Sequence, residues 1–419
     1  MSSRTDVTVK NLIVFNSRLG SKEGEEANKI LFYYPKNEEL DKKIKNVGLC
    51  EAIIKFTSAF TSNSDVKNVI TQKTVQIYFQ PETEFWMIFT LYVPYNVKLK
   101  LNQEQIDYRN DDAHIYVYYH MIQQIYASFK LLHGTLLSNF RGNTLTAQQE
   151  NLSAVLDKFF NTFSINNYPK STEIFNIFHS VNYFAVDKLN FLRHQAFSNM
   201  IKSTFSDIDY SIFLFRQKIL WSSLSSETLF NFYEYLKRER FLKREKENTT
   251  IWIDGVRYIV LIYKTVNCIN CHFVKCNKNG RENLFKDLCT FMDAQVIKIE
   301  IDLENLKKSF PQEKLDAIYK HIFLNELTYK HESSLSNLLK DSTIIPLDIT
   351  NILADMFEYE SESSVELVVK THNDFWIIQK TTNCRHYFLV TCKSTSTLIE
   401  ITEEATHLMK NHIRNIFFF

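Results

Sequence analysis

The sequence predicts an α+β fold made of three units, in each of which an antiparallel sheet packs with helices. Strand-like and helix-like segments follow the order two strands, helix, three strands, helix or helices, and this order occurs three times along the chain. Strands that come in runs, rather than alternating singly with helices, favour antiparallel sheets. A length of 419 residues also suits roughly three domains.

The first unit is predicted to span residues 1–140. Apolar runs give its strands, and Asn37-Glu38-Glu39 opens its first helix with an N-cap residue and acids in the first turn. Asp111-Asp112 precede a second helix, whose apolar positions keep a spacing of three and four residues. The predicted strands lie at 7–15, 29–34, about 68–79 and 85–93, and the predicted helices at about 38–60 and after 112.

The second unit is predicted to span residues 187–310 and the third 311–419. Residues 141–186 are polar and poor in helix signals, so they are predicted to be a linker with local helix. Asp254-Gly255 is a strong two-residue hairpin turn in the second unit. The predicted strands are 210–215, 218–222, 249–253, 256–266, about 271–276, 319–329, SVELVVK, DFWIIQK and HYFLVTC, and the predicted helices lie at about 225–243, 281–308, 346–358 and 400–415.

Composition argues against several function classes. Lys and Arg number 49 against 48 Asp and Glu, so no net field would steer the chain to nucleic acid. The polar start is not a signal peptide and no apolar run approaches the ~20 residues that span a bilayer, so any membrane role is expected to be peripheral. Seven cysteines, an odd number, favour reduced thiols in the cytosol. Only seven glycines argue against an enzyme with several tight phosphate or cofactor loops, and we expect no cofactor.

The segment FNSRLGSKEGEEANKILFYYP, residues 15–35, has the strand, glycines and lysines with which many phosphate-binding loops begin. It lacks the Gly-x-x-x-x-Gly-Lys-Ser/Thr signature, and Glu25 and Glu26 after Gly24 would repel a phosphate. It also leads into a strand and not into a helix N-terminus. A solvated connection between two strands is the better interpretation, although its length also suits a functional loop.

Cys268-Ile269-Asn270-Cys271-His272 has the form of a c-type haem attachment motif, and Cys276 adds a further zinc ligand. Haem attachment belongs to exported proteins, and a second ligand pair at ordinary zinc spacing is absent from the sequence. We therefore favour structural thiols in a hairpin and predict no metal site. No Gly-x-Ser-x-Gly or comparable nucleophile elbow occurs, so the sequence gives no sign of covalent catalysis.

The run LKRERFLKREKEN, residues 236–248, carries six basic residues with three Glu between them. A solvated helix end is the favoured interpretation. The functional alternative is a contact with anionic lipid headgroups, where each Lys or Arg is worth about 1 kcal/mol. That contact would use Lys237, Arg238, Arg240, Lys243 and Arg244.

The helix at 38–60 carries two apolar stripes, which are centred roughly 150° apart at about 100° per residue. A helix on one face of a sheet needs only one stripe, so the second meets either another helix of the same domain or a partner protein. Gly48 lies between the stripes, where a glycine permits close approach of another backbone and favours an interface. One stripe is Leu40, Ile44, Val47, Cys50 and Ile54, and the other is Leu49, Ile53, Phe56 and Phe60.

These same residues carry a resemblance to a known family. The loop 15–35, the segment KIKNVGLCEAI at 43–53, Phe85-Trp86-Met87 and the terminal Asn415-Ile416-Phe417-Phe418-Phe419 resemble the Ccz-type vacuolar fusion proteins. The similarity is long and specific over about the first 95 residues, and moderate over 187–236 and 318–419. The segments 138–186 and 240–310 match poorly.

The resemblance implies three longin domains and an obligate partner of the Mon type. Together the two chains would act as a guanine-nucleotide exchange factor for the late-endosomal Rab GTPase, and in animals with a third, propeller-containing subunit. The chain would be cytoplasmic and peripheral on late endosome and lysosome membranes, where it would drive endosome maturation and fusion with lysosomes. Such a factor carries out no covalent chemistry, so it is not an enzyme in that sense.

The resemblance also implies that the first longin domains of the two chains pair and that their joint surface binds the GTPase. We expect Lys43, Asn46 and Gly48 near the GTPase or the partner, and Leu49, Ile53 and Phe56 in the apolar interface. The main alternative is a non-catalytic longin scaffold or coat-type adaptor that binds vesicle proteins. A related one is an exchange factor for the Rab of a lysosome-related organelle.

Overall fold

The computed structural model describes residues 3–416 except 5–6, 21, 61–65, 101–102, 109–114, 164–176, 185, 187, 240–248, 277–280, 310–318, 335–346, 359–363 and 394. Asp111-Asp112, the predicted domain border at 310/311 and the last three Phe residues lie outside the described residues. The chain forms two compact units, Met1–Ile177 and Phe178–Phe419.

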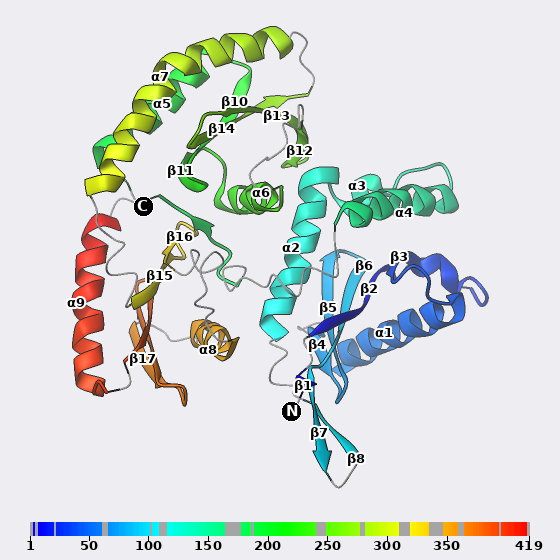
Figure 1. Ribbon diagram of the computed structural model, residues 1–419. Coiled ribbons are helices and arrows are strands. Elements are labelled where there is room, and N and C mark those ends of the chain that lie inside the picture. Colours follow the sequence, from blue (N-terminus) through cyan, green and yellow to red (C-terminus); the bar gives the residue numbers. More distant parts are fainter. Residues whose placement is uncertain are drawn as a thin grey trace. The chain divides into compact units, whose positions relative to one another are not determined.

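The first unit is built on a five-stranded antiparallel sheet of order β3-β2-β6-β5-β4 (Figure 1). Side chains alternate between its two faces, so in β2 Leu12 and Val14 enter one core while Ile13 and Phe15 enter the other. Burial on both faces explains why the strand sequences are almost continuously apolar. The strands are β2 (Thr8–Asn16), β3 (Ile30–Tyr34), β4 (Asn68–Ile70), β5 (Thr74–Glu82) and β6 (Phe85–Tyr92).

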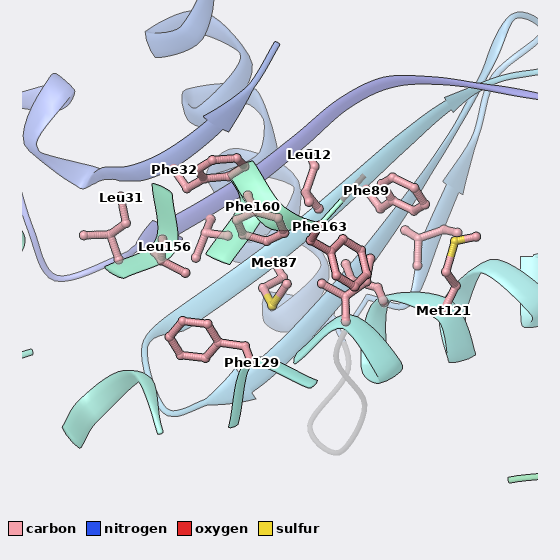
Figure 2. Close-up of a cluster of buried hydrophobic side chains, with 14 of the residues drawn as sticks. Leu12, Leu31, Phe32, Met87, Phe89, Met121, Phe129, Leu156, Phe160 and Phe163 are labelled. Carbon is pink, nitrogen blue, oxygen red and sulfur yellow. The ribbon is translucent and has the colours of Figure 1, made fainter. Parts of the chain in front are cut away.

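Helices cover both faces of this sheet. One face packs against α1 (Leu40–Phe60), and the other packs against α2 (Ile115–His133), α3 (Leu136–Asn139) and α4 (Leu145–Thr162). Figure 2 shows side chains from the sheet and from α2 and α4 pointing toward one another in the second of these cores. The short helix η1 (Glu26–Lys29) lies in the loop before β3.

Helix α4 falls within the segment 141–186. Its Leu152, Leu156 and Phe159 are buried in the core of the first sheet, and the Phe160 ring stacks on Phe32 with centroids 4.2 Å apart (Figure 2). Residues 145–162 are therefore an integral part of the first unit. The predicted strand at 68–79 is wrong as a single element, because the chain turns between β4 and β5.

A separate three-stranded antiparallel sheet of order β1-β7-β8 adjoins the first repeat in sequence. Its strands are β1 (Ser3–Arg4), β7 (Tyr95–Lys100) and β8 (Gln103–Tyr108). The polar sequence of this hairpin does not predict strands.

The second unit contains two more sheets. The five-stranded sheet has order β11-β10-β14-β13-β12, and the six-stranded sheet has order β17-β18-β19-β15-β16-β9. Tyr183, just after β9, bridges to Ile219 of β11 and so joins the margins of the two sheets. The elements are β9 (Val181–Asn182), α5 (Lys188–Thr204), β10 (Ile208–Phe215), β11 (Lys218–Ser222), α6 (Ser226–Arg238), β12 (Thr249–Ile253), β13 (Val256–Lys264), β14 (Cys268–Lys275), α7 (Arg281–Ser309), β15 (Tyr319–Asn325), β16 (Lys330–Ser333), α8 (Leu347–Glu358), β17 (Ser364–Lys370), β18 (Phe375–Thr382), β19 (Arg385–Cys392) and α9 (Leu398–Ile416).

One topology occurs three times. Counting strands within each repeat, the sheet order is 2-1-5-4-3 in β2–β6, in β10–β14 and in β15–β19, with a helix after the second strand and another after the fifth. The predicted α+β class with antiparallel sheets is therefore confirmed. The predicted turn at Asp254-Gly255 is also confirmed, because both residues have positive φ and Ile253 pairs with Val256.

Candidate functional site

Helix α1 lies along one face of the first sheet (Figure 1). Val47 and Cys50 are buried among the strand side chains and Ile54 packs beside them, so the first predicted stripe faces the sheet. Burial raises the pKa of the Cys50 thiol to about 11. Leu40, the first residue of the helix, belongs to the same stripe but is exposed.

The opposite side of α1 is apolar and open to solvent. Leu49, Phe56 and Phe60 are 54%, 67% and 75% exposed, and the two rings lie together with centroids 4.8 Å apart. We call these three residues the apolar face of α1. Exposed apolar side chains gathered on one surface are typical of protein interaction sites.

The equivalent helices of the other two repeats differ from α1. Helix α6 follows the second strand of its repeat and buries Leu229, Phe232 and Leu236, and α8 buries Leu353 and Met356. In the described parts of α6 and α8, no large hydrophobic side chain is exposed. A helix that follows the second strand of a repeat therefore does not need an apolar outer face to fold. The apolar face of α1 is thus not explained by packing within its own repeat.

Three of the predicted interface residues contact their own domain. Ile53 is half-buried and packs against the core beneath α1. The Asn46 amide donates to the Tyr33 hydroxyl at 2.7 Å, and the Lys43 ammonium donates to the carbonyl of Lys36 at 2.8 Å. Their predicted contact with a GTPase or a partner stays a prediction.

Gly48 is exposed in the middle of α1. A Cβ atom added there would have no heavy atom of this chain within 4 Å, apart from its own helix and neighbours. The glycine is thus not needed for packing within the chain, although glycine costs a helix interior about 1 kcal/mol relative to alanine. A close approach at Gly48 would have to come from another molecule.

Replacing Gly48 by Ala is expected to stabilise the isolated chain by up to about 1 kcal/mol and to weaken its binding to a partner helix. Urea unfolding of the chain would measure the first effect, and calorimetric titration with the partner would measure the second. Unchanged affinity would place the partner's backbone away from Gly48. Ala52→Gly, on the same exposed side, is the reverse control, because it should destabilise the helix without adding bulk.

A largely buried ion pair connects the loop 16–30 to α1. The Lys29 ammonium lies 2.6 Å from the Glu51 carboxylate, with side chains only 15% and 11% exposed, and Lys55 approaches the same carboxylate at 2.7 Å. Burial raises the pKa of Glu51, but the hydrogen bonds from Lys29 and Lys55 outweigh it and leave the pKa below its usual value. Sequence reasoning missed this pair, because an acid at position 51 signals a buried ion pair only once the neighbouring Val47 and Cys50 are known to face the sheet.

Replacing Glu51 by Ala should lower the free energy of unfolding by about 2 kcal/mol, because it leaves Lys29 largely buried without its carboxylate. Lys55→Ala removes the exposed partner of the same carboxylate and should cost under about 0.5 kcal/mol. The contribution of Glu51 should be lost as the pH falls below 4.5, where the unfolded carboxyl becomes protonated. Equal losses in the two variants, measured by urea unfolding, would contradict this assignment.

The loop 16–30 is not built to hold a phosphate. The Gly24 amide donates to the Glu26 carboxylate at 3.1 Å, so the amide that could bind a phosphate already binds a carboxylate of the same loop. The loop then passes through η1 into β3. Gly20 has φ +55°, and a Cβ there would lie 2.2 Å from the Glu25 carbonyl, so the turn requires glycine.

The basic run is only partly described, because Arg240, Lys243 and Arg244 lie outside the described residues. Lys237 and Arg238, at the end of α6, are half-buried. Lys237 pairs with Glu234 at 2.9 Å, so part of its charge is balanced within the helix. The predicted lipid contact stays a prediction.

The cysteines and histidine of the haem-like motif lie in β14, with Cys268, Cys271 and His272 buried in the sheet. His272 Nδ1 and the Ser211 hydroxyl oxygen are 2.9 Å apart. Burial raises the pKa of Cys268 to about 12 and lowers that of His272 to about 3. Across the described residues, no three His, Cys, Asp or Glu side chains gather to hold a metal.

No helix in the described part of the chain is both long enough and apolar enough to cross a bilayer.

Comparison with known proteins agrees with this geometry. Residues 9–134, which include α1 and the first sheet, match the family described as the first longin domain of INTU, CCZ1 and HPS4. The longin assignment of the first repeat is thereby confirmed.

Similarity also extends along the whole chain. The vacuolar fusion protein CCZ1 homolog of Nematostella vectensis is 29% identical over 99% of both chains. The homolog of Xenopus tropicalis is 25% identical over 97% of this chain and 96% of its own, and that of Dictyostelium discoideum is 21% identical over 98% of each. The resemblance to Ccz-type vacuolar fusion proteins is confirmed over most of the chain. The matched stretch runs across the segments 138–186 and 240–310, and their expected poor match stays a prediction.

Proposed function

We propose that this chain is a subunit of a heteromeric guanine-nucleotide exchange factor that activates a late-endosomal Rab GTPase, with a Mon-type longin protein as its partner. The observation that supports this best is the exposed apolar face of α1, within the residues that match a first longin domain. The similarity to vacuolar fusion proteins over nearly the whole chain supports a role in endosome maturation and fusion with lysosomes.

The proposed activity uses binding energy alone. An exchange factor binds the nucleotide-free GTPase more tightly than the loaded form, and by reciprocity it lowers the affinity for nucleotide. Each tenfold acceleration of this kind needs about 1.4 kcal/mol of differential binding. Reordering of a switch segment that contacts magnesium and phosphate would supply it.

In this mechanism α1 serves assembly. Leu49, Phe56 and Phe60 would pack against the partner, and Gly48, beside Leu49, would admit a neighbouring backbone at the margin of this face. Lys43 and Asn46 are held by contacts to Lys36 and Tyr33, so they would present a fixed polar margin beside the apolar face. A surface of this kind can position a GTPase without any catalytic side chain.

Release of a fluorescent GDP from the GTPase tests the proposal. We expect release at the intrinsic rate with either subunit alone and strong acceleration with both. A panel of GTPases would identify the one that responds, and a Rab of a lysosome-related organelle would be the informative competitor. Intrinsic release in every mixture, with the complex intact, would leave the non-catalytic scaffold or adaptor.

The proposed location is the cytoplasmic surface of late endosomes and lysosomes, with peripheral attachment to anionic membrane and, in animals, a third propeller-containing subunit. Lys237 and Arg238 are the described candidates for a lipid contact. Flotation of the complex with vesicles that contain or lack anionic lipid would test this, with Lys237→Glu and Arg238→Glu as variants.

A further inference from the structure

Strand β17 is an outermost strand of the six-stranded sheet (Figure 1). It pairs with β18 along all seven of its residues, and among the described residues no strand pairs with its other edge. A long edge strand is a ready template for pairing with another chain.

The two faces of β17 differ. Glu366, Val368 and Lys370 alternate along the face toward α9, where Val368 packs against the core. Leu367 and Val369 point to the other face and are half-buried. The sequence Glu-Leu-Val-Val-Lys therefore places opposite charges at equal distances on either side of Val368.

The equivalent strands of the other repeats lack this pattern. Strand β4 has three residues, and β12 has five residues and no charge. The outer strand β8 of the small sheet has six residues, and its charged residues, Glu104 and Asp107, are both acidic. Within the described chain, β17 is the longest edge strand and the one whose charges complement a reversed copy of itself.

We propose that β17 pairs antiparallel with β17 of a second copy of this chain, about a two-fold axis at Val368. In that register Glu366 lies directly opposite Lys370 of the other copy, and the same contact occurs again by symmetry. On the other face Leu367 lies opposite Val369. Opposite-charge and apolar cross-strand pairs stabilise antiparallel strands, and a two-fold interface must be self-complementary in this way.

The charges remain within reach of a second copy. Glu366 already contacts Lys380 at 3.1 Å, yet 46% of its side chain is exposed. Lys370 lies 3.9 Å from Asp374 and 5.0 Å from the centre of the Trp376 ring, and 40% of its side chain is exposed. Charges that protect an edge strand from association are placed so that two copies of the strand repel each other. In the proposed register Glu366 and Lys370 of the two copies attract each other instead.

Charge reversal of the full chain tests the proposal by sedimentation velocity over a concentration series. We expect the native chain to dimerise reversibly, and Glu366→Lys and Lys370→Glu each to raise the dimer dissociation constant about tenfold or more. The double reversal should restore the native value. Mixing the two single variants should also restore association, because a strand with two lysines then meets one with two glutamates.

The mixing experiment also shows that both variants are folded. Asp287→Lys, an exposed reversal on α7, is the matched control and should leave association unchanged. Leu49→Asp should also leave it unchanged, since α1 serves the separate interface proposed above. A native chain that stays monomeric, single reversals without effect, or a mixture that fails to associate would each overturn the proposal.

Discussion

Replacing Leu49 and Phe56 together by Asp should weaken binding to the Mon-type partner by at least about a hundredfold and abolish accelerated GDP release. Both side chains are more than half exposed in this chain, so two Asp residues there should leave its fold intact. In the complex the two carboxylates would be buried in an apolar interface, and the free-energy cost of that burial weakens binding. Co-purification and calorimetric titration would measure the loss. Ile53 is left unchanged because it also packs against the core of its own domain.

The matched control for this double variant is Leu145→Asp. Leu145 is 59% exposed and opens α4, where an acid is tolerated at the first turn, and α4 packs on the opposite face of the sheet. This variant should bind the partner normally. Normal binding by the double variant as well would remove α1 from the interface.

Acidification from neutral pH to about pH 5 should destabilise the second unit by about 4 kcal/mol through His272 and His331. Burial lowers the pKa of each to about 3 from 6.5, with Lys237 and Lys218 adding to the effect at His331. Both groups stay neutral when folded but bind a proton when unfolded. Their full contribution to stability is thus present above pH 6.5 and is lost progressively as the pH falls below it.

Urea unfolding at several pH values would measure this dependence. His272→Asn keeps a polar group near Ser211 but cannot titrate, so it should remove about half of the pH-dependent loss. His372→Asn, at an exposed position, should leave the pH dependence unchanged. Equal slopes for the native chain and His272→Asn would show that His272 does not control acid stability.

The repeated order of strands and helices could be predicted from sequence because apolar runs and turn residues mark each strand. Helix α5 could not, because its buried face mixes polar and apolar residues. Asn190, His194 and Ser198 are buried there together with Phe197 and Ile201, whereas Leu189 and Leu192 are exposed. Periodicity identifies a helix by its apolar face, and the signal weakens where polar side chains are buried and leucines are exposed. The backbone carbonyl of Asn190 and His194 Nδ1 are 2.6 Å apart, and the apolar periodicity of a sequence does not predict such a polar contact.

The candidate site was predictable only in part. Two stripes on α1 showed that one of them was surplus, but both are apolar, so sequence alone could not say which faces the sheet. The structure assigns Val47 and Cys50 to the core and Leu49 and Phe56 to the surface. The contacts of Asn46 and Lys43 depend on Tyr33 and Lys36, which precede the helix and meet it only through the fold.

The strand order has a consequence for synthesis of the chain on the ribosome. In every repeat the first strand pairs with the fifth, with a helix and two strands made between them. The first strand can pair with the second at once, but its other edge has no partner until the fifth strand has emerged. Apolar strand edges therefore stay exposed while each repeat is being synthesised. We therefore expect nascent chains that stop before Phe85 to be recognised by chaperones, whereas those that continue through α4 should already hold a folded first unit.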